Sequence, residues 1–411
     1  MKHNIKEQKL ICSFCSLSEL DVDFLVEGEN VYICDKCVIK ASEIVKENFK
    51  KSVLKNNLLD KKPQSLKDNL DQHIISQDTA KRIVSVAVYN HLKRINQRYD
   101  SQSVEIEKSN ILLVGPTGTG KTLIAKTLAN ILNVPFAIAD ATVLTEAGYV
   151  GEDVENILVR LYQAADYDIK QAEMGIIYVD EIDKISRKDG NPSITRDVSG
   201  EGVQQALLKM FEGTVANIPP KGGRKHPEQP LVSIDTKNIL FICGGAFQGL
   251  EDIIEKRIAG GGIGFNRNIK KNKFDNHLFK YSQPEDLLKY GFIPELIGRL
   301  PVIAPLDELD NKTMLSILTK PKNAIIKQYQ KLFELENIQL DFTPSALKAI
   351  VEKARKRKTG ARALRSVLEE AMIDIMFETP SKNNVNTCLV TDEVINNKSE
   401  PIYKLINKKT A

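Results

Sequence analysis

The sequence predicts an α/β protein in which a parallel sheet with flanking helices is the largest part. A small metal-binding domain precedes it, and a smaller helix-rich α+β domain follows it. Three observations carry this prediction: four cysteines stand in two pairs near the start, a glycine-rich loop lies between an apolar strand and a helix, and helical periodicity dominates after residue 307. At 411 residues and 42% hydrophobic content, the chain is long enough for two or three domains.

Charge and hydropathy exclude several classes of protein. The net charge of +4 at pH 7 argues neither for nor against a polyanionic partner, so a nucleic-acid role would need a local basic patch. No nucleic acid is expected as a partner. There is no apolar run of about 18 residues, and the polar start Met1–Lys6 lacks the apolar core of a signal peptide. We expect a cytoplasmic protein without a membrane segment.

The cysteine pairs come first along the chain. Cys12-x-x-Cys15 is followed, after eighteen residues, by Cys34-x-x-Cys37, a spacing typical of four-thiolate zinc sites. With all four positions filled by protein, the ion has no place for a reactive water, so the site is structural. The alternatives are a disulfide pair and a catalytic zinc. A domain over residues 1–50 is too small to bury much apolar surface, and its apolar residues form either a small core or a dimer or adaptor surface: Phe14, Leu17, Phe24, Leu25 and Val31.

Composition places the next boundaries. Residues 51–66 are rich in Lys and Asn and contain Pro63, so we predict a linker. The large domain is predicted over residues 67–306, with an early helix from about Asp78 to Gln97. A small domain with a C-terminal tail is predicted over residues 307–411.

The central motif is the phosphate-binding loop at residues 115–122, which fits G-x-x-x-x-G-K-[ST] at every fixed position. An apolar strand, residues 111–114, enters it and a helix follows. The glycines allow close backbone approach to a triphosphate, and the helix N-terminus offers amide dipoles. Lys121 adds a charge near the outer phosphates, and Thr122 offers a hydroxyl to Mg2+. A glycine-rich turn without a ligand is the alternative. The motif predicts ATP and Mg2+ as ligands.

Two acids follow a second apolar strand. Asp180 and Glu181 come after residues 175–179, at the carboxyl end of a predicted parallel strand. We assign Asp180 to magnesium binding and Glu181 to orienting or deprotonating the attacking water; a solvated strand end is the alternative. A further buried strand, Ile239–Cys243, ends in two glycines without a polar residue.

Three loops and two arginines offer side chains to a ligand or partner. The plainer interpretation is a packed turn for the loop with Tyr149 and Val150. It is a solvated charged face for the loop at 224–226 and a misassigned fold element for the loop at 263–265. Each arginine is either paired within the fold or offered to a phosphate. The loop residues are Tyr149 and Val150, then Arg224, Lys225 and His226, then Ile263, Gly264 and Phe265; the arginines are Arg299 and Arg362.

From Cys12 to about Glu378 the chain resembles the ClpX family of AAA+ unfoldases, which feed the ClpP peptidase. The likeness includes the runs Asp180–Ile185 and Val198–Leu208. It implies an AAA+ module, a homohexameric ring with ATP at subunit interfaces, and hydrolysis that pulls unfolded or tagged protein substrates through a pore into ClpP. Adaptor proteins would bind the zinc domain. No peptidase activity of its own is implied.

The resemblance also assigns individual residues. Tyr149 and Val150 match the substrate-gripping pore loop, Arg224, Lys225 and His226 the basic pore entrance, and residues 187–202 the second pore loop. Ile263, Gly264 and Phe265 match the tripeptide that docks on ClpP. Arg299 matches the arginine given to the neighbouring nucleotide, and Arg362 the sensor arginine of the small domain. The nucleotide-binding set is Ile74, Ile75, Gly115, Pro116, Thr117, Gly118, Thr119, Gly120, Lys121, Thr122 and Leu123.

The sequence departs from the family pattern at Ser76, where a glycine is usual near the adenine pocket. The polar residue that many AAA+ proteins place after the strand at 239–243 is also missing, and that role is unassigned. Two other functions stay open: a nucleic-acid motor or clamp-loader-type ATPase, and a scaffold that binds ATP without hydrolysis. Tracking a phosphate backbone favours lysines where Tyr149 and Val150 stand, and Glu181 argues for hydrolysis.

Overall fold

The computed structural model describes residues 10–29, 31–42, 44, 62–96, 104, 106–145, 152–186, 200–220, 230–259, 278–382 and 384–405. Three predicted groups lie outside these residues: Tyr149 with Val150, Arg224 to His226, and Ile263 to Phe265. Of the predicted second pore loop, only residues 200–202 are described. The chain divides between Lys61 and Lys62 into two compact units. Within the described ranges, no helix has the length and apolar character needed to cross a membrane.

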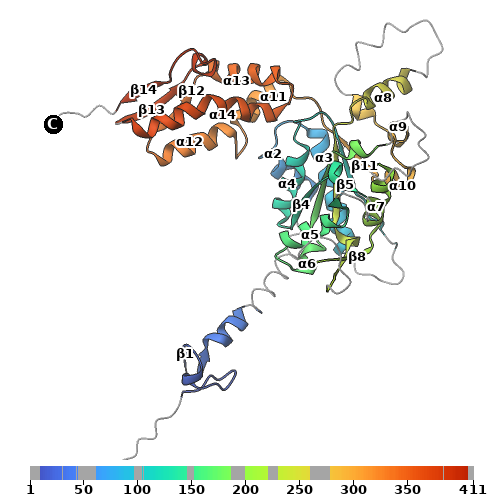
Figure 1. The fold of residues 1–411 in the computed structure, drawn as a ribbon, viewed down its shortest axis with the longest axis vertical. Coiled ribbons are helices and arrows are strands. Elements are labelled where there is room, and N and C mark those ends of the chain that lie inside the picture. The colour runs from blue at the N-terminus through green and yellow to red at the C-terminus, as the bar shows by residue number, and fades with distance from the viewer. Residues whose placement is uncertain are drawn as a thin grey trace, which may run out of the picture. The chain divides into compact units, whose positions relative to one another are not determined.

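The first unit is a small hairpin with one helix (Figure 1). Strand β1 (Leu25–Gly28) pairs antiparallel with β2 (Val31–Cys34), and residues 35–42 are helical. A 3-10 turn, η1 (Glu19–Asp21), precedes the hairpin. Its only buried apolar residues, among those described, are Cys12 and Cys34, while Phe14 is 72% exposed. A core this small cannot hold the unit together without a further cross-link.

The second unit contains a five-stranded sheet in the order β11-β3-β10-β7-β4, with all neighbours parallel. The central strands are buried along their whole length because helices cover both faces. Thus the first strand of the domain, β3, neighbours the fourth and fifth strands. The strands are β3 (Ile111–Val114), β4 (Phe136–Asp140), β7 (Ile176–Asp180), β10 (Leu240–Gly245) and β11 (Val302–Pro305).

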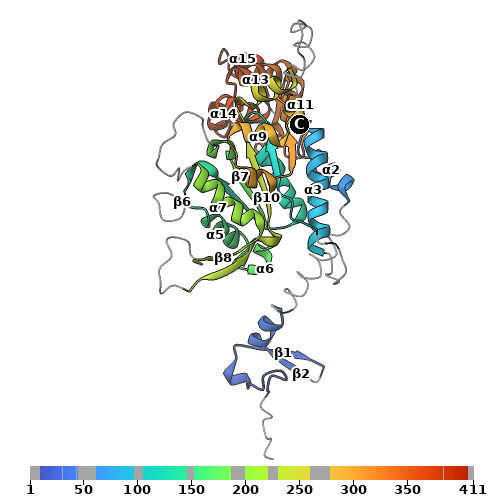
Figure 2. The ribbon, with the colours of Figure 1, turned by 90° about the vertical axis from the view of Figure 1, so that its right-hand side faces the viewer.

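Helices pack on this sheet from both sides. Helix α4 (Lys121–Leu132) packs on β7 and β10, and α5 (Asn156–Ala164) on β4. Helices α2 (Pro63–Asp71) and α3 (Asp78–Asn96) lie side by side (Figure 2). Helix α3 also packs on β3 and β11. The remaining elements are β5 (Leu144–Thr145), β6 (Glu152–Asp153), α6 (Ile169–Ala172), α7 (Glu201–Glu212), β8 (Val215–Ile218), β9 (Val232–Asp235), α8 (Leu250–Ala259), α9 (Pro284–Tyr290) and α10 (Pro294–Gly298).

A smaller domain with its own core completes the second unit. Strand β13 pairs parallel with β12 and antiparallel with β14, beside five helices among the described residues. Thr343 caps α13 by accepting from the Ala346 amide, and Pro344 occupies the first helical position. The elements are α11 (Asn311–Thr319), α12 (Ile325–Leu335), β12 (Gln339–Phe342), α13 (Pro344–Lys356), α14 (Ala361–Glu378), β13 (Val385–Val390), α15 (Asp392–Ile395) and β14 (Ile402–Leu405).

The fold class is confirmed: a parallel sheet with flanking helices, a helix-rich α+β domain and a small cysteine-containing unit. Local bounds differ, for example at β10, which spans Leu240–Gly245 and not Ile239–Cys243, and at the start of α2. Helix α2 begins at Pro63, so the last four residues of the range predicted as linker are helical. The reason is burial, because Leu66 and Leu70 are fully buried on this helix.

Candidate functional site

A pocket of about 660 Å³ lies in the second unit, between the glycine-rich loop, the carboxyl end of β7 and the helices α12 and α14. Most of the residues predicted to bind nucleotide or perform chemistry border it. The predicted residues in its lining are Thr117, Gly118, Gly120, Lys121, Thr122, Leu123, Asp180, Glu181 and Arg362.

The loop has the backbone that its glycines permit. Gly118 and Gly120 have φ angles of +77° and +104°, where a side chain would be strained. A Cβ on Gly115 would lie 2.5 Å from the carbonyl oxygen of Leu306, so this glycine is needed for close packing between loop and chain. Helix α4 begins at Lys121, within the last two residues of the motif. Its first amides therefore face the pocket end of the loop, where an anion is favoured.

Lys121 is folded back on its own loop. Its Nζ donates to the carbonyl oxygens of Gly115 at 2.7 Å and Pro116 at 2.9 Å. Burial lowers the pKa of Lys121 to about 8, against the raising effect of the Asp180 and Asp183 carboxylates. A triphosphate would supply the negative charge that favours a buried ammonium here.

Asp180 is held through both of its carboxylate oxygens. Thr122 Oγ1 donates to Oδ2 at 3.3 Å, and the backbone amide of Glu181 and the Tyr178 hydroxyl donate to Oδ1 at 3.0 and 3.1 Å. The two strands that lead to Thr122 and Asp180 are not adjacent, because β10 lies between β3 and β7. Strand β10 ends in Gly244 and Gly245, so no side chain of this strand end separates Thr122 from Asp180.

Glu181 has a φ of +55°, in the left-handed region that residues other than glycine seldom adopt. Its side chain borders the pocket beside Asp180. Such backbone strain is concentrated at functional sites, where the surrounding structure holds it in place. The turn directs two successive acids to one pocket.

The small domain contacts the loop directly. The amide of Ala361, the first residue of α14, donates to the Gly118 carbonyl oxygen at 3.0 Å. A Cβ on Gly118 would lie 2.2 Å from the Thr359 carbonyl oxygen, and one on Gly360 would lie 2.8 Å from that of Thr117. Two glycines thus allow backbone to meet backbone, and Arg362 enters the pocket from the first turn of α14.

Several predicted residues lie elsewhere. Arg299 does not line the pocket; its guanidinium pairs with Glu212 at 3.4 Å and Glu107 at 3.9 Å. Ile74 is buried, and neither it nor Ile75 lines the pocket. Ser76, in place of a glycine, has a φ of +60°. The departure from the family pattern therefore leaves a serine in a backbone conformation that favours glycine.

Some pocket residues had no assigned role in the sequence. Asp183 is buried and accepts hydrogen bonds from the amides of Ala246 and Phe247, at 3.2 and 3.3 Å, just after β10. Its sequence position, three residues after Asp180, is the one feature that could have indicated a place near the pocket. His73, for which no role is predicted, also lines the pocket, as do Gln248, Asn323 and Arg365.

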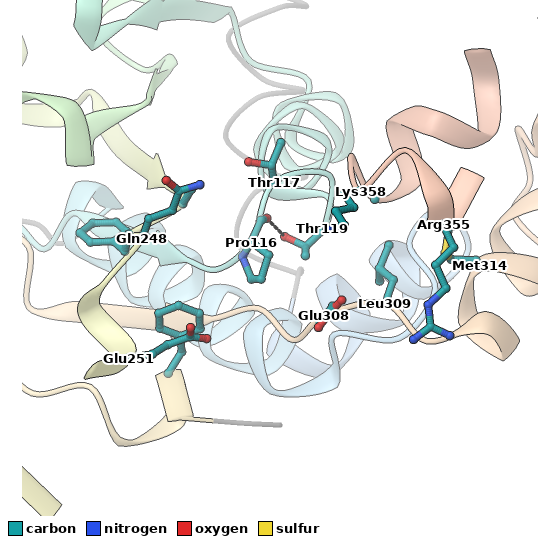
Figure 3. A pocket seen from close by; sticks show the side chains of 14 residues that line it. Pro116, Thr117, Thr119, Gln248, Glu251, Glu308, Leu309, Met314, Arg355 and Lys358 are labelled. Atoms are coloured by element: carbon teal, nitrogen blue, oxygen red, sulfur yellow. Dashed lines mark hydrogen bonds between the residues drawn. The ribbon is translucent and has the colours of Figure 1, made fainter. Parts of the chain in front are cut away.

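A second cavity, of about 290 Å³, lies against the same loop (Figure 3). Pro116 and Thr119 line it, and Thr119 Oγ1 donates to the Pro116 carbonyl oxygen at 2.8 Å. Glu251 and Glu308 border it as well, and burial raises the pKa of Glu251, with Asp252 and Glu308 adding to the effect. Its lining does not include the Asp180 and Glu181 carboxylates, so it does not share their chemistry.

The four paired cysteines of the first unit converge. The Sγ atoms of Cys12, Cys15, Cys34 and Cys37 all lie within 4.8 Å of one another, and none is in a disulfide. The amide of Cys34 donates to Cys12 Sγ at 3.3 Å, and that of Cys37 to Cys34 Sγ at 3.4 Å. Four thiolates with amide donors around them fit a tetrahedral zinc ion, with every position filled by protein.

A phosphate-binding loop, acids at the end of a parallel strand of the same sheet, and an arginine from a smaller domain define an ATPase of the AAA class. Family models agree: residues 106–303 match the AAA domain (Cdc48 subfamily), residues 309–391 the C-terminal, D2-small domain of ClpB protein, and residues 10–47 the ClpX C4-type zinc finger. The ligands of such a chain are ATP, Mg2+ and zinc.

The particular family follows from two relatives. Proteins from two strains of Porphyromonas gingivalis, each described as the ATP-dependent Clp protease ATP-binding subunit ClpX, are 53% identical to this chain over 382 residues. The alignment covers 92% of this chain and 93% of each relative. The chain belongs to the ClpX family.

Proposed function

We propose that this chain is an ATP-dependent protein unfoldase and translocase. It recognises tagged substrates, unfolds them and threads them through the pore of a homohexamer into the ClpP peptidase, and it remodels protein complexes in the manner of a chaperone. The relatives, which are named as the ATP-binding subunit of a Clp protease, support the peptidase as partner.

One observation carries the proposal. The pocket gathers the loop, both acids and Arg362 from two domains of one chain, yet Arg299 stands outside its lining. Arg299 is instead tied to Glu212 and Glu107, and its side chain is 38% exposed. An arginine that is accessible but outside its own pocket is suited to reach the nucleotide of a second copy, as arginine fingers do.

Each pocket residue then has a role in hydrolysis. Loop amides and Lys121 hold the phosphates, while Thr122 and Asp180 hold Mg2+, which neutralises charge on the phosphates. Glu181 orients or deprotonates the attacking water. Arg299 of one subunit and Arg362 of the other neutralise charge that develops on the transferred group, a contribution that reaches about 10³–10⁵-fold in rate in enzymes with an arginine finger.

Exposed apolar side chains support assembly and adaptor binding. On the small domain, Phe377 is 84% and Leu335 70% exposed. Exposure of apolar side chains to water is unfavourable, and contact with another copy would bury them. On the first unit, Leu20 is 83% and Phe14 72% exposed. We assign the first pair to the ring and the second to adaptors or a second zinc unit.

The polypeptide-handling residues come from the family resemblance. Tyr149 and Val150 grip the substrate, an aromatic and a β-branched side chain that bind by contact area and so tolerate many sequences. Arg224, Lys225 and His226 lie at the pore entrance, and residues 187–202 form a second pore loop. Ile263, Gly264 and Phe265 dock on ClpP.

The deciding experiment is degradation of a fluorescent, tagged protein by the full chain with ATP, with and without added ClpP. We expect loss of fluorescence in both cases, and peptide release only with ClpP. Tyr149→Ala should retain ATP hydrolysis and lose unfolding. Glu181→Gln should bind ATP but hydrolyse it about 10²–10⁴-fold more slowly than the wild type. Glu334→Gln, an exposed acid of α12, is the matched control.

Two results would contradict the proposal. Wild-type unfolding by Tyr149→Ala removes the grip assignment. ATP hydrolysis that is stimulated by DNA or RNA and not by tagged protein indicates a nucleic-acid motor instead.

A further inference from the structure

Strand β7 carries one polar side chain in its apolar run. Tyr178 is fully buried between Ile177 and Val179, two residues before Asp180. Because side chains alternate along a strand, Tyr178 and Asp180 lie on the same face of the sheet. That face is covered by α4, the helix that begins with Lys121 and Thr122.

The tyrosine hydroxyl meets the carboxylate. Tyr178 OH donates to Asp180 Oδ1 at 3.1 Å, while Thr122 donates to the other oxygen, Oδ2, at 3.3 Å. The Glu181 amide is the further donor to Oδ1, at 3.0 Å. An ionised carboxylate only accepts hydrogen bonds, so the phenol must be the donor.

A glycine in the neighbouring strand makes this contact possible. A Cβ on Gly244 of β10 would lie 2.1 Å from the Tyr178 hydroxyl oxygen and 2.8 Å from its Cζ. The aromatic ring is rigid and fully buried, so it cannot give way to a side chain there. Tyr178 therefore reaches across the end of β10, the strand that separates β7 from the strand leading into the glycine-rich loop.

We propose that Tyr178 is a positioning residue for the magnesium site: its hydroxyl, admitted by Gly244, fixes the Asp180 carboxylate opposite Thr122. The inference rests on the proposed role of Asp180 in magnesium binding.

The test measures binding of a fluorescent, non-hydrolysable ATP analogue to the full chain across graded Mg2+ and in EDTA. Tyr178→Phe removes only the hydroxyl. We expect it to raise the Mg2+ concentration for half-maximal tightening by about 3- to 10-fold, the net contribution of one typical intramolecular hydrogen bond. Affinity in EDTA should stay that of the wild type, since the loop contacts are intact. In the ATPase assay, kcat at saturating Mg2+ should fall less than the Mg2+ requirement rises.

Two further variants separate the possible failures. Asp180→Asn should shift the Mg2+ requirement more than Tyr178→Phe, because it removes the carboxylate itself. Tyr162→Phe, a buried tyrosine of α5 packed edge-on against Tyr167, is the matched control and should shift nothing.

If Asp180→Asn shifts the Mg2+ requirement and Tyr178→Phe does not, the positioning role is wrong while the magnesium role stands. If neither shifts it, the magnesium assignment fails too. A Tyr178→Phe protein that loses affinity equally in EDTA and in Mg2+ shows a merely structural tyrosine, and also overturns the inference.

Discussion

At the scale of single residues, the pocket is dominated by charges in unusual surroundings. Lys121 is buried and donates to two carbonyl oxygens of its own loop, while Asp180 and Glu181 stand side by side at a strand end. A buried ammonium and two neighbouring carboxylates are each costly without a charge of opposite sign beside them. In the proposed function, phosphates beside Lys121 and Mg2+ beside Asp180 would supply these opposite charges.

The lowered pKa of Lys121 predicts a pH dependence of ATP binding. In the free protein its pKa is about 8, so the charge is lost as the pH rises through that value. Bound phosphates favour the ammonium and raise its pKa, so ATP binding takes up a proton in this range. Affinity should therefore fall about tenfold between roughly pH 7 and pH 9.

Calorimetry in two buffers of different ionisation enthalpy measures this proton uptake at about pH 8.5. Lys121→Arg is the matched control, because a guanidinium stays protonated throughout and the uptake should vanish. Equal uptake in the two proteins would assign the proton to another group.

At the scale of elements, the meeting of the loop with the start of α14 joins the two domains of the second unit. Gly118 and Gly360 touch through backbone atoms alone, and the Ala361 amide closes the contact. Arg362 therefore enters the pocket only while α14 stays in place. If the small domain moved away from the loop, Arg362 would leave the pocket with α14.

Gly360→Ala should break this contact. The residue has a φ of +59°, and the new Cβ would lie 2.8 and 2.9 Å from the Thr117 and Gly118 carbonyl oxygens. We expect a loss of about 1–3 kcal/mol in unfolding free energy, together with weaker ATP binding. Thermal denaturation and nucleotide titration measure the two effects.

Gly249→Ala is the control for strain alone, because Gly249 has a φ of +89° but nothing within 4 Å of its Cβ. It should lower stability and leave nucleotide affinity intact. Matching nucleotide affinities in the two variants would show that the domain contact has no influence on the pocket.

The individual helices and strands were easier to predict from the sequence than the question of which of them lie next to one another. The loop at 115–122 was found because one contiguous stretch must meet all the backbone demands of a phosphate. The position of β10 between β3 and β7 was not predicted, since local periodicity does not depend on strand order. His73 and Asn323 were missed for the same reason: each borders the pocket only because distant segments fold against the loop. The linker was extended four residues too far because Leu66 shows its burial only in the fold.

At the scale of the whole molecule, the two units differ in what stabilises them. The second unit has extensive apolar cores in both domains, whereas the first buries little beyond its cysteines among the described residues. Metal binding must therefore supply much of the folding free energy of the first unit.

Zinc removal should unfold the first unit alone. A strong chelator, or Cys37→Ser, should abolish amide protection over residues 10–44 while the thermal transition of residues 62–411 stays in place. Hydrogen exchange with zinc analysis measures both. Ser18→Ala, in an exposed turn of the same unit, should keep its metal, and amide protection that survives chelation would show that zinc is not required.

The contact between Gly118 and Ala361 also has a consequence for biosynthesis. Chains emerge from the ribosome with the N-terminal part first, and domains fold as they appear. The glycine-rich loop is made early, while its partner at the start of α14 follows only after the rest of the sheet and the helices α11, α12 and α13 of the small domain. A nascent chain can thus fold its sheet while the pocket still lacks the part that α14 contributes.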